Sequence, residues 1–175
     1  MMSQTTESLR KIPLSTGSAR IMDLTDLITP DGIIPALKVK SKKQALQELA
    51  ERAAVLTNAN PRRIFEALLQ RERLGSTGVG RGIAIPHGKI ADVKHIFTMF
   101  ARLEDKVDFE SMDGEPVDLI FLLLAPESAG ADHLKALARI SRLLRDPAAI
   151  EKLRGSKDRA ALYSVLTEPL ASHAA

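Results

Sequence analysis

The chain has 175 residues, of which 45% are hydrophobic and 3% aromatic, and it carries a formal net charge of +3 at pH 7. This length and apolar content predict one domain with an aliphatic core. The mild, mixed charge and the scarcity of aromatic rings argue against a nucleic-acid-binding surface, and the absence of cysteine excludes disulfides, thiolate metal sites and cysteine nucleophiles.

Residues 1–20 are rich in serine and threonine and poor in apolar side chains, so we expect a flexible tail followed by one domain over residues 21–170. This tail lacks the apolar centre of a signal peptide. No apolar run in the chain reaches the roughly eighteen residues that a membrane-spanning helix needs. We therefore expect a cytoplasmic protein with no membrane insertion.

The first half of the domain is predicted to contain one strand and two helices. Ile33–Val39 is a β-prone run opened by a Pro-Asp-Gly turn. Ser41 is expected to cap a helix, and Asn60 followed by Pro61 is expected to start a second one. The apolar residues of these two segments recur at helical spacing; they are Ala45, Leu46, Leu49, Ala53, Ile64, Leu68 and Leu69.

The second half is predicted to contain two longer strands and three helices. Ile96–Leu103 is interpreted as a strand, and the almost unbroken apolar run Val117–Leu124 as a strand buried on both faces. A helix follows, and Asp146 and Ser156 are expected to cap two shorter ones. The helix that directly follows Val117–Leu124 is expected to bury one apolar face, made of Leu134, Leu137, Ile140 and Leu144. This order favours an α/β fold: a single domain with a mixed β-sheet of about five strands and helices on both faces.

A glycine-rich stretch in the middle of the chain leads into a histidine. His87 lies between a proline and a glycine, a setting that suits the end of a short strand and not the interior of a helix. The stretch carries Gly75, Gly78, Gly80 and Gly82, and the cations near it in sequence are Arg71, Arg73, Arg81 and Lys89. An imidazole among cations and exposed backbone N–H groups suits a nucleophile that meets a phosphoryl group.

Other uses of the same glycines and histidines fit the sequence poorly. The stretch has neither the Gly-Lys-Ser/Thr ending of a phosphate-binding loop nor the third glycine of a dinucleotide fingerprint, because Ile83 stands there. The four histidines lack the spacing of metal ligands. We expect no metal and no cofactor.

The string from Arg71 to Lys89, RERLGSTGVGRGIAIPHGK, resembles the phosphorylation-site region of a known family. Its end, GIAIPHGK, is similar to the motif of the fructose/mannitol-type enzyme IIA domains of the bacterial phosphotransferase system, and the fuller string looks most like the nitrogen-regulatory branch. Ser41–Leu46, Pro116–Phe121 and His133–Leu137 also resemble segments of this family. The likeness covers residues 21–166, nearly the whole chain.

This resemblance implies a set of site residues. His87 matches the phosphoryl acceptor, and Arg71 and His133 match the arginine and the second histidine expected beside it. A neutral imidazole attacks through one nitrogen, so the other must keep its proton, usually against an acceptor such as a backbone carbonyl. Ser76 and Thr77 are expected to offer hydroxyl donors to the phosphate, and Gly88 to let a donor protein approach closely.

Simpler interpretations remain open for several of these residues on sequence grounds. His133 also fits an ordinary residue in the first turn of a helix, and Arg71 a solvated arginine paired with Glu66 or Glu72. Ser76 and Thr77 also fit as caps of local turns. No role is expected for His95 or His173.

The resemblance implies a histidine phosphocarrier that accepts its phosphoryl group from an HPr-like protein and regulates partner proteins by its phosphorylation state. The family suggests potassium-transport or stringent-response proteins as targets. The alternative is a sugar-transport enzyme IIA that passes the group to a fructose- or mannitol-type IIB domain. The absence of cysteine implies that no such IIB domain is fused here, and Arg81, where mannitol-type domains have a carboxylate, favours the nitrogen-related branch.

Overall fold

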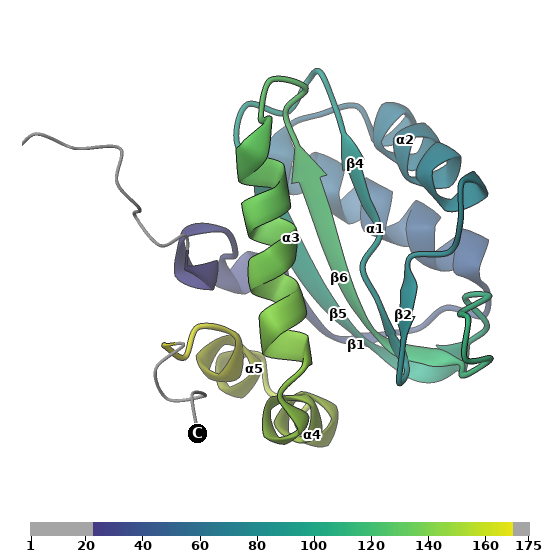
Figure 1. The fold of residues 1–175 in the computed structure, drawn as a ribbon, viewed down its shortest axis with the longest axis vertical. Coiled ribbons are helices and arrows are strands. Elements are labelled where there is room, and N and C mark those ends of the chain that lie inside the picture. The colour runs from purple at the N-terminus through teal and green to yellow at the C-terminus, as the bar shows by residue number, and fades with distance from the viewer. Residues whose placement is uncertain (1–22, 170–175) are drawn as a thin grey trace, which may run out of the picture.

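A mixed β-sheet with helices on both faces forms the framework of the protein (Figure 1). The computed structural model describes residues 23–169, so the expected tail, residues 1–20, lies outside the described residues. The six strands are β1 (Ile33–Leu37), β2 (Gly78–Gly80), β3 (Ile83–Ala84), β4 (His87–Lys89), β5 (Phe97–Val107) and β6 (Val117–Ala125). The helices are α1 (Lys42–Thr57), α2 (Pro61–Arg73), α3 (Ala131–Leu144), α4 (Pro147–Gly155) and α5 (Arg159–Leu166), with 3₁₀ turns η1 (Leu24–Asp26) and η2 (Pro30–Gly32).

Strand β6 is the centre of the sheet, as its apolar sequence predicts. All of its residues except Asp118 are buried. It pairs with β5 antiparallel along one edge and with both β3 and β4 parallel along the other, and β1 extends the sheet beyond β5. The expected α/β architecture is confirmed, with a sixth strand.

The additional strand arises because Pro86 interrupts the segment that leads to His87. Proline has no N–H to give to the ladder, and the pairing with β6 stops after Ala84 and resumes at His87 opposite Leu123. The carbonyl of Pro86 still accepts from the Leu123 N–H at 3.0 Å. His87 is thus the first residue of a short edge strand held against the most buried strand of the fold.

Two apolar cores fill the spaces between the sheet and its helices. One lies under α1 and α2, and the other lies under α3, α4 and α5 (Figure 1). Three of the four expected helix caps are present: the side chains of Ser41, Asn60 and Asp146 each accept a hydrogen bond from a backbone N–H of the first turn. No helix within residues 23–169 is long and apolar enough to cross a bilayer.

Two sequence-based expectations on the carboxyl-terminal helices are wrong. Helix α5 is capped by Asp158, whose carboxylate accepts from the Ala161 N–H at 3.1 Å, whereas Ser156 ends α4. Leu134 is not part of the buried face of α3, because its side chain is 67% exposed. It lies two residues, or about 200° around the helix axis, from the buried Ala136.

Candidate functional site

A pocket of about 620 Å³ opens beside strand β4. One wall comes from the last turns of α2 and the residue after it, the floor comes from β4, and α3 supplies a histidine. The lining residues are Ala67, Gln70, Arg71, Arg73, Leu74, His87, Gly88, Lys89 and His133. Three of them are cations and none is acidic, so the pocket favours an anion.

Close packing between α2 and β4 sets the position of Arg71. A Cβ added to Gly88 would lie 3.4 Å from the Cβ of Ala67, so the helix lies close against the strand at this point. Arg71 follows Ala67 by four residues and shares its face of the helix. Because Gly88 has no side chain, α2 can pack closely against β4, and this contact places Arg71 beside the His87 ring.

Hydrogen bonds to both ring nitrogens fix the state of His87. Its Nδ1 lies 2.8 Å from the carbonyl oxygen of Ile85, and because a carbonyl can only accept, Nδ1 carries the proton. The neutral ring then has its lone pair on Nε2, where the Nε–H of Arg71 donates at 3.2 Å. The nitrogen facing the pocket is the nucleophilic one, as phosphoryl transfer requires.

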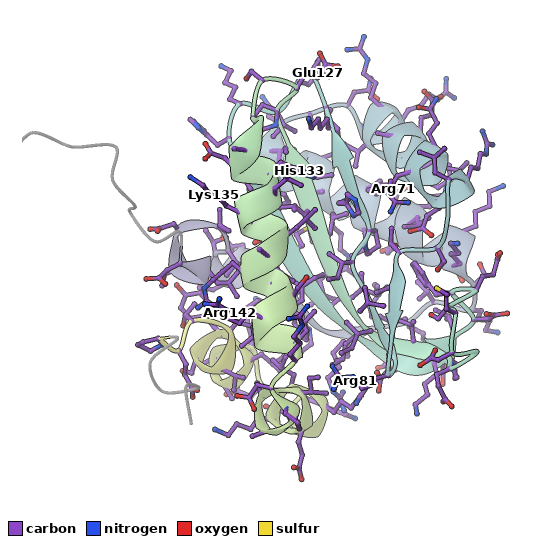
Figure 2. All side chains as sticks on the ribbon, viewed as in Figure 1. Arg71, Arg81, Glu127, His133, Lys135 and Arg142 are labelled. Carbon is purple, nitrogen blue, oxygen red and sulfur yellow. The ribbon has the colours of Figure 1, made fainter. Side chains whose placement is uncertain are left out.

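Arg71 is held at this place by a second hydrogen bond. Its Nη1 donates to the carbonyl oxygen of Gly75 at 2.9 Å. It pairs with neither Glu66 nor Glu72, because Glu72 is bound to Lys42 instead. In Figure 2, Arg71 and His133 lie on the two sides of β4, from α2 and α3.

His133 completes the group on the α3 side. Its ring centroid lies 5.6 Å from that of His87, and its Nε2 is buried without a hydrogen-bond partner. Burial lowers the pKa of His133 below its ordinary value, and any positive charge on the neighbouring His87, together with that of Lys89, lowers it further. His133 thus brings a ring nitrogen without a hydrogen-bond partner close to the ring of His87.

Three other residues predicted near the histidine lie elsewhere. The Ser76 hydroxyl donates to the carbonyl of Phe109, and the buried Thr77 hydroxyl donates to Glu72, so neither lines the pocket. Arg81 does not surround His87, because it lies in the turn between β2 and β3, and β3 leads away from this turn toward His87. It lies near α4 at the opposite end of the sheet, where its Nη2 donates to the carbonyl of Leu144 (Figure 2).

Two parts of the site were not predicted from sequence. The carbonyl of Ile85 leaves no signal in a side-chain pattern, although the proline after it marks a break in pairing. Glu72 is buried near the end of α2. Its burial could not be predicted from sequence, because it is one of several charged residues in that helix. Within residues 23–169, no three His, Asp or Glu side chains gather to hold a metal ion.

Comparison with known proteins assigns this geometry to a family. Residues 26–168 match the family described as "Phosphoenolpyruvate-dependent sugar phosphotransferase system, EIIA 2". The chain is 65% identical to a nitrogen regulatory protein of Bradyrhizobium diazoefficiens over 153 residues, 87% of this chain and 100% of the relative. It is 35% identical to that of Escherichia coli over 154 residues, 87% of this chain and 94% of the relative.

The fold agrees with a solved structure of the same kind. Nitrogen regulatory protein IIA-Ntr from Neisseria meningitidis superimposes with a TM-score of 0.78 at 34% identity, over 82% of this chain and 99% of that one. Both the sequence and the backbone of this chain are therefore similar to nitrogen regulatory enzyme IIA proteins over nearly their full length.

The environment of His133 predicts its titration. We expect its imidazole to lose its proton below the ordinary pKa of 6.5, because burial and nearby positive groups such as Lys89 oppose a charge there. Lys89→Gln removes one of these groups and is expected to raise the pKa of His133, whereas Lys94→Gln, an exposed lysine outside the pocket, is expected to leave it unchanged. NMR titration of the ring protons measures this, and a pKa at or above 6.5 in the unmodified protein would contradict the described burial.

Proposed function

The chain belongs to the enzyme IIA type 2 family of the phosphoenolpyruvate-dependent sugar phosphotransferase system, and we propose that it carries the phosphoryl group on Nε2 of His87. Its relatives include nitrogen regulatory proteins, one of them 65% identical, which supports a role in the nitrogen-related branch. The observation that supports His87 as acceptor is its ring state: Nδ1–H on the Ile85 carbonyl, and the lone pair on the pocket side.

The transfer step uses the groups already at the pocket. The Nε2 lone pair of His87 attacks the phosphorus, the bond from phosphorus to the donor's own phosphorylated group breaks, and the donor keeps that electron pair. The His87 ring gains positive charge as the new P–N bond forms, so the Nδ1–H bond to the Ile85 carbonyl strengthens during the step. That bond therefore stabilises the transition state more than the resting ring.

Arg71 and His133 would take up the charge of the transferred group. The Arg71 guanidinium already lies at the attacking atom, Nε2 of His87, so its N–H groups need only turn toward the incoming phosphoryl oxygens. His133 lines the same pocket, and its Nε2 has no hydrogen-bond partner. Two negative charges beside it favour its protonated form, and His133 then donates to a phosphoryl oxygen.

The donor is proposed to be an HPr-like protein that docks over this pocket. Leu74 and Leu134 stand on the α2 and α3 sides of the site with 86% and 67% of their side chains exposed. Exposed apolar side chains beside a reactive centre suit a protein partner that excludes water from the transfer. The HPr-like donor and any regulated target would then compete for one surface.

Phosphorylation assays test the acceptor. His87→Ala is expected to take up no acid-labile phosphoryl group from enzyme I, an HPr-type donor and phosphoenolpyruvate, because it removes the ring nitrogen whose lone pair the Ile85 contact directs to the pocket side. His95→Ala is the matched control, since His95 is an exposed histidine outside the pocket, and it is expected to react as the unaltered protein does. Phosphorylation of His87→Ala at the unaltered rate would exclude His87 as acceptor.

A charge placed on this surface is expected to change partner binding. A phosphohistidine adds nearly two negative charges between Leu74 and Leu134, and a partner docked on apolar contacts would have to desolvate them. Phosphorylated protein is therefore expected to bind the unphosphorylated HPr-type protein at least tenfold more weakly, by titration calorimetry.

A matched pair of variants separates this effect from a general loss of solubility. Leu74→Asp is expected to weaken binding in the same way, whereas Val55→Asp, 82% exposed at the end of α1 and outside the pocket, is expected to have no effect. Equal affinities for phosphorylated and unphosphorylated protein would leave a phosphocarrier without a switch.

A further inference from the structure

A buried carboxylate lies directly behind the pocket. Only 3% of the Glu72 side chain is exposed, although most other charged residues of α2 are exposed. Burying a charge is costly unless it is paired and hydrogen-bonded. Glu72 has both: Lys42 Nζ lies 2.8 Å away, and the backbone N–H and hydroxyl of Thr77 both donate to it.

These contacts close the loop between α2 and β2. Glu72 binds Thr77 across five residues, and inside the loop the Gly75 N–H donates to the Glu72 carbonyl at 3.1 Å. Lys42 anchors the carboxylate to the start of α1, and its Nζ also lies 5.3 Å from the centre of the Phe109 ring. The loop therefore has a fixed shape, set by one carboxylate.

A chain of hydrogen bonds leads from this loop to the nucleophile. The carbonyl of Thr77 accepts from the Ile85 N–H at 2.9 Å. The carbonyl of Ile85 in turn accepts from Nδ1 of His87 at 2.8 Å. Thr77 therefore holds the Ile85 backbone in place, and the position of the Ile85 carbonyl against Nδ1 of His87 depends on where Thr77 lies.

Glu72 also controls the opposite side of the ring through its neighbour. Arg71 precedes it in the chain, and the carbonyl that holds the Arg71 guanidinium belongs to Gly75, within the loop that Glu72 closes. The two nitrogens of His87 are thus bound by Ile85 and by Arg71, and the positions of both depend on the Glu72–Thr77 contact.

We infer that Glu72 is a positioning residue for phosphoryl transfer: through Thr77 it holds His87 in its Nδ1–H form and Arg71 at Nε2. The inference rests on the proposed function for its consequence, but the ring state of His87 can be measured without any donor. The Thr77 hydroxyl, expected from sequence to contact phosphate, acts here on the carboxylate instead.

The tautomer of His87 is the direct readout. We propose ¹⁵N NMR of the two ring nitrogens of His87 in Glu72→Gln, Thr77→Val and Thr77→Ser. Thr77→Val keeps the shape but loses the hydroxyl donor, and Thr77→Ser keeps the hydroxyl. We expect the Nδ1–H population to fall in Glu72→Gln and Thr77→Val and to be retained in Thr77→Ser, with phosphorylation slowed about tenfold to a hundredfold in the first two.

Asp118→Asn is the matched control. Asp118 is also an acidic side chain bound by several N–H donors, those of Arg154, but it lies at the opposite end of β6 from the pocket. It is expected to lower the melting temperature and leave the His87 tautomer unchanged.

The outcomes separate the inference from the proposed function. An unchanged Nδ1–H population in folded Glu72→Gln and Thr77→Val overturns the positioning role, as does an equal change in Asp118→Asn, which would reflect stability alone. A changed tautomer in a protein that accepts no phosphoryl group would retain the positioning role and refute the proposed function.

Discussion

The hydrogen bond from Nδ1 of His87 to the Ile85 carbonyl is the interaction on which the rest of the site depends. Without it, the ring proton would be free to move to the pocket-facing nitrogen and the lone pair would point away from the pocket. The Ile85 backbone points away from β6, because its N–H donates to the Thr77 carbonyl at 2.9 Å, whereas the carbonyl of the next residue, Pro86, accepts from the Leu123 N–H of β6. The Ile85 carbonyl is therefore on the side of the strand where Nδ1 of His87 can reach it.

Rigid elements supply the remaining geometry. The most buried strand of the sheet fixes His87, the close contact between Gly88 and Ala67 fixes α2, and α3 brings His133 from the other side. It matters that these residues are in place before the reaction. Phosphoryl transfer is accelerated mainly by positioning and by hydrogen-bond donors aimed at the equatorial oxygens of the phosphoryl group. The pocket needs no large movement to accept a phosphoryl group, only a turn of the Arg71 guanidinium.

Much of the fold was predictable from sequence because its signals are local. The caps at Ser41 and Asn60 and the apolar run of β6 each follow from residue chemistry over a few positions. The sequence predicted His87 at the end of a short strand, whereas it is the first residue of β4, because the pairing with β6 resumes after Pro86.

The features that could not be predicted from sequence depend on the direction in which the chain runs and on contacts between residues far apart in the sequence. Arg81 is near His87 in sequence but lies in the turn between β2 and β3, at the far end of an extended segment. Glu72 is buried because Lys42, thirty positions earlier, and Thr77 meet it, and no pattern within α2 announces this. Leu134 follows helical spacing but is 67% exposed, because it lies on the side of α3 away from the buried Ala136.

The identity of the phosphorylated atom tests the account most directly. After phosphorylation of protein labelled with ¹⁵N in its histidines, ³¹P–¹⁵N correlation reveals which ring nitrogen carries the phosphorus. The account predicts phosphorus on Nε2 of His87, with Nδ1 still protonated and still bound to the Ile85 carbonyl. Phosphorus on Nδ1 of His87, or on either nitrogen of His133, would contradict it.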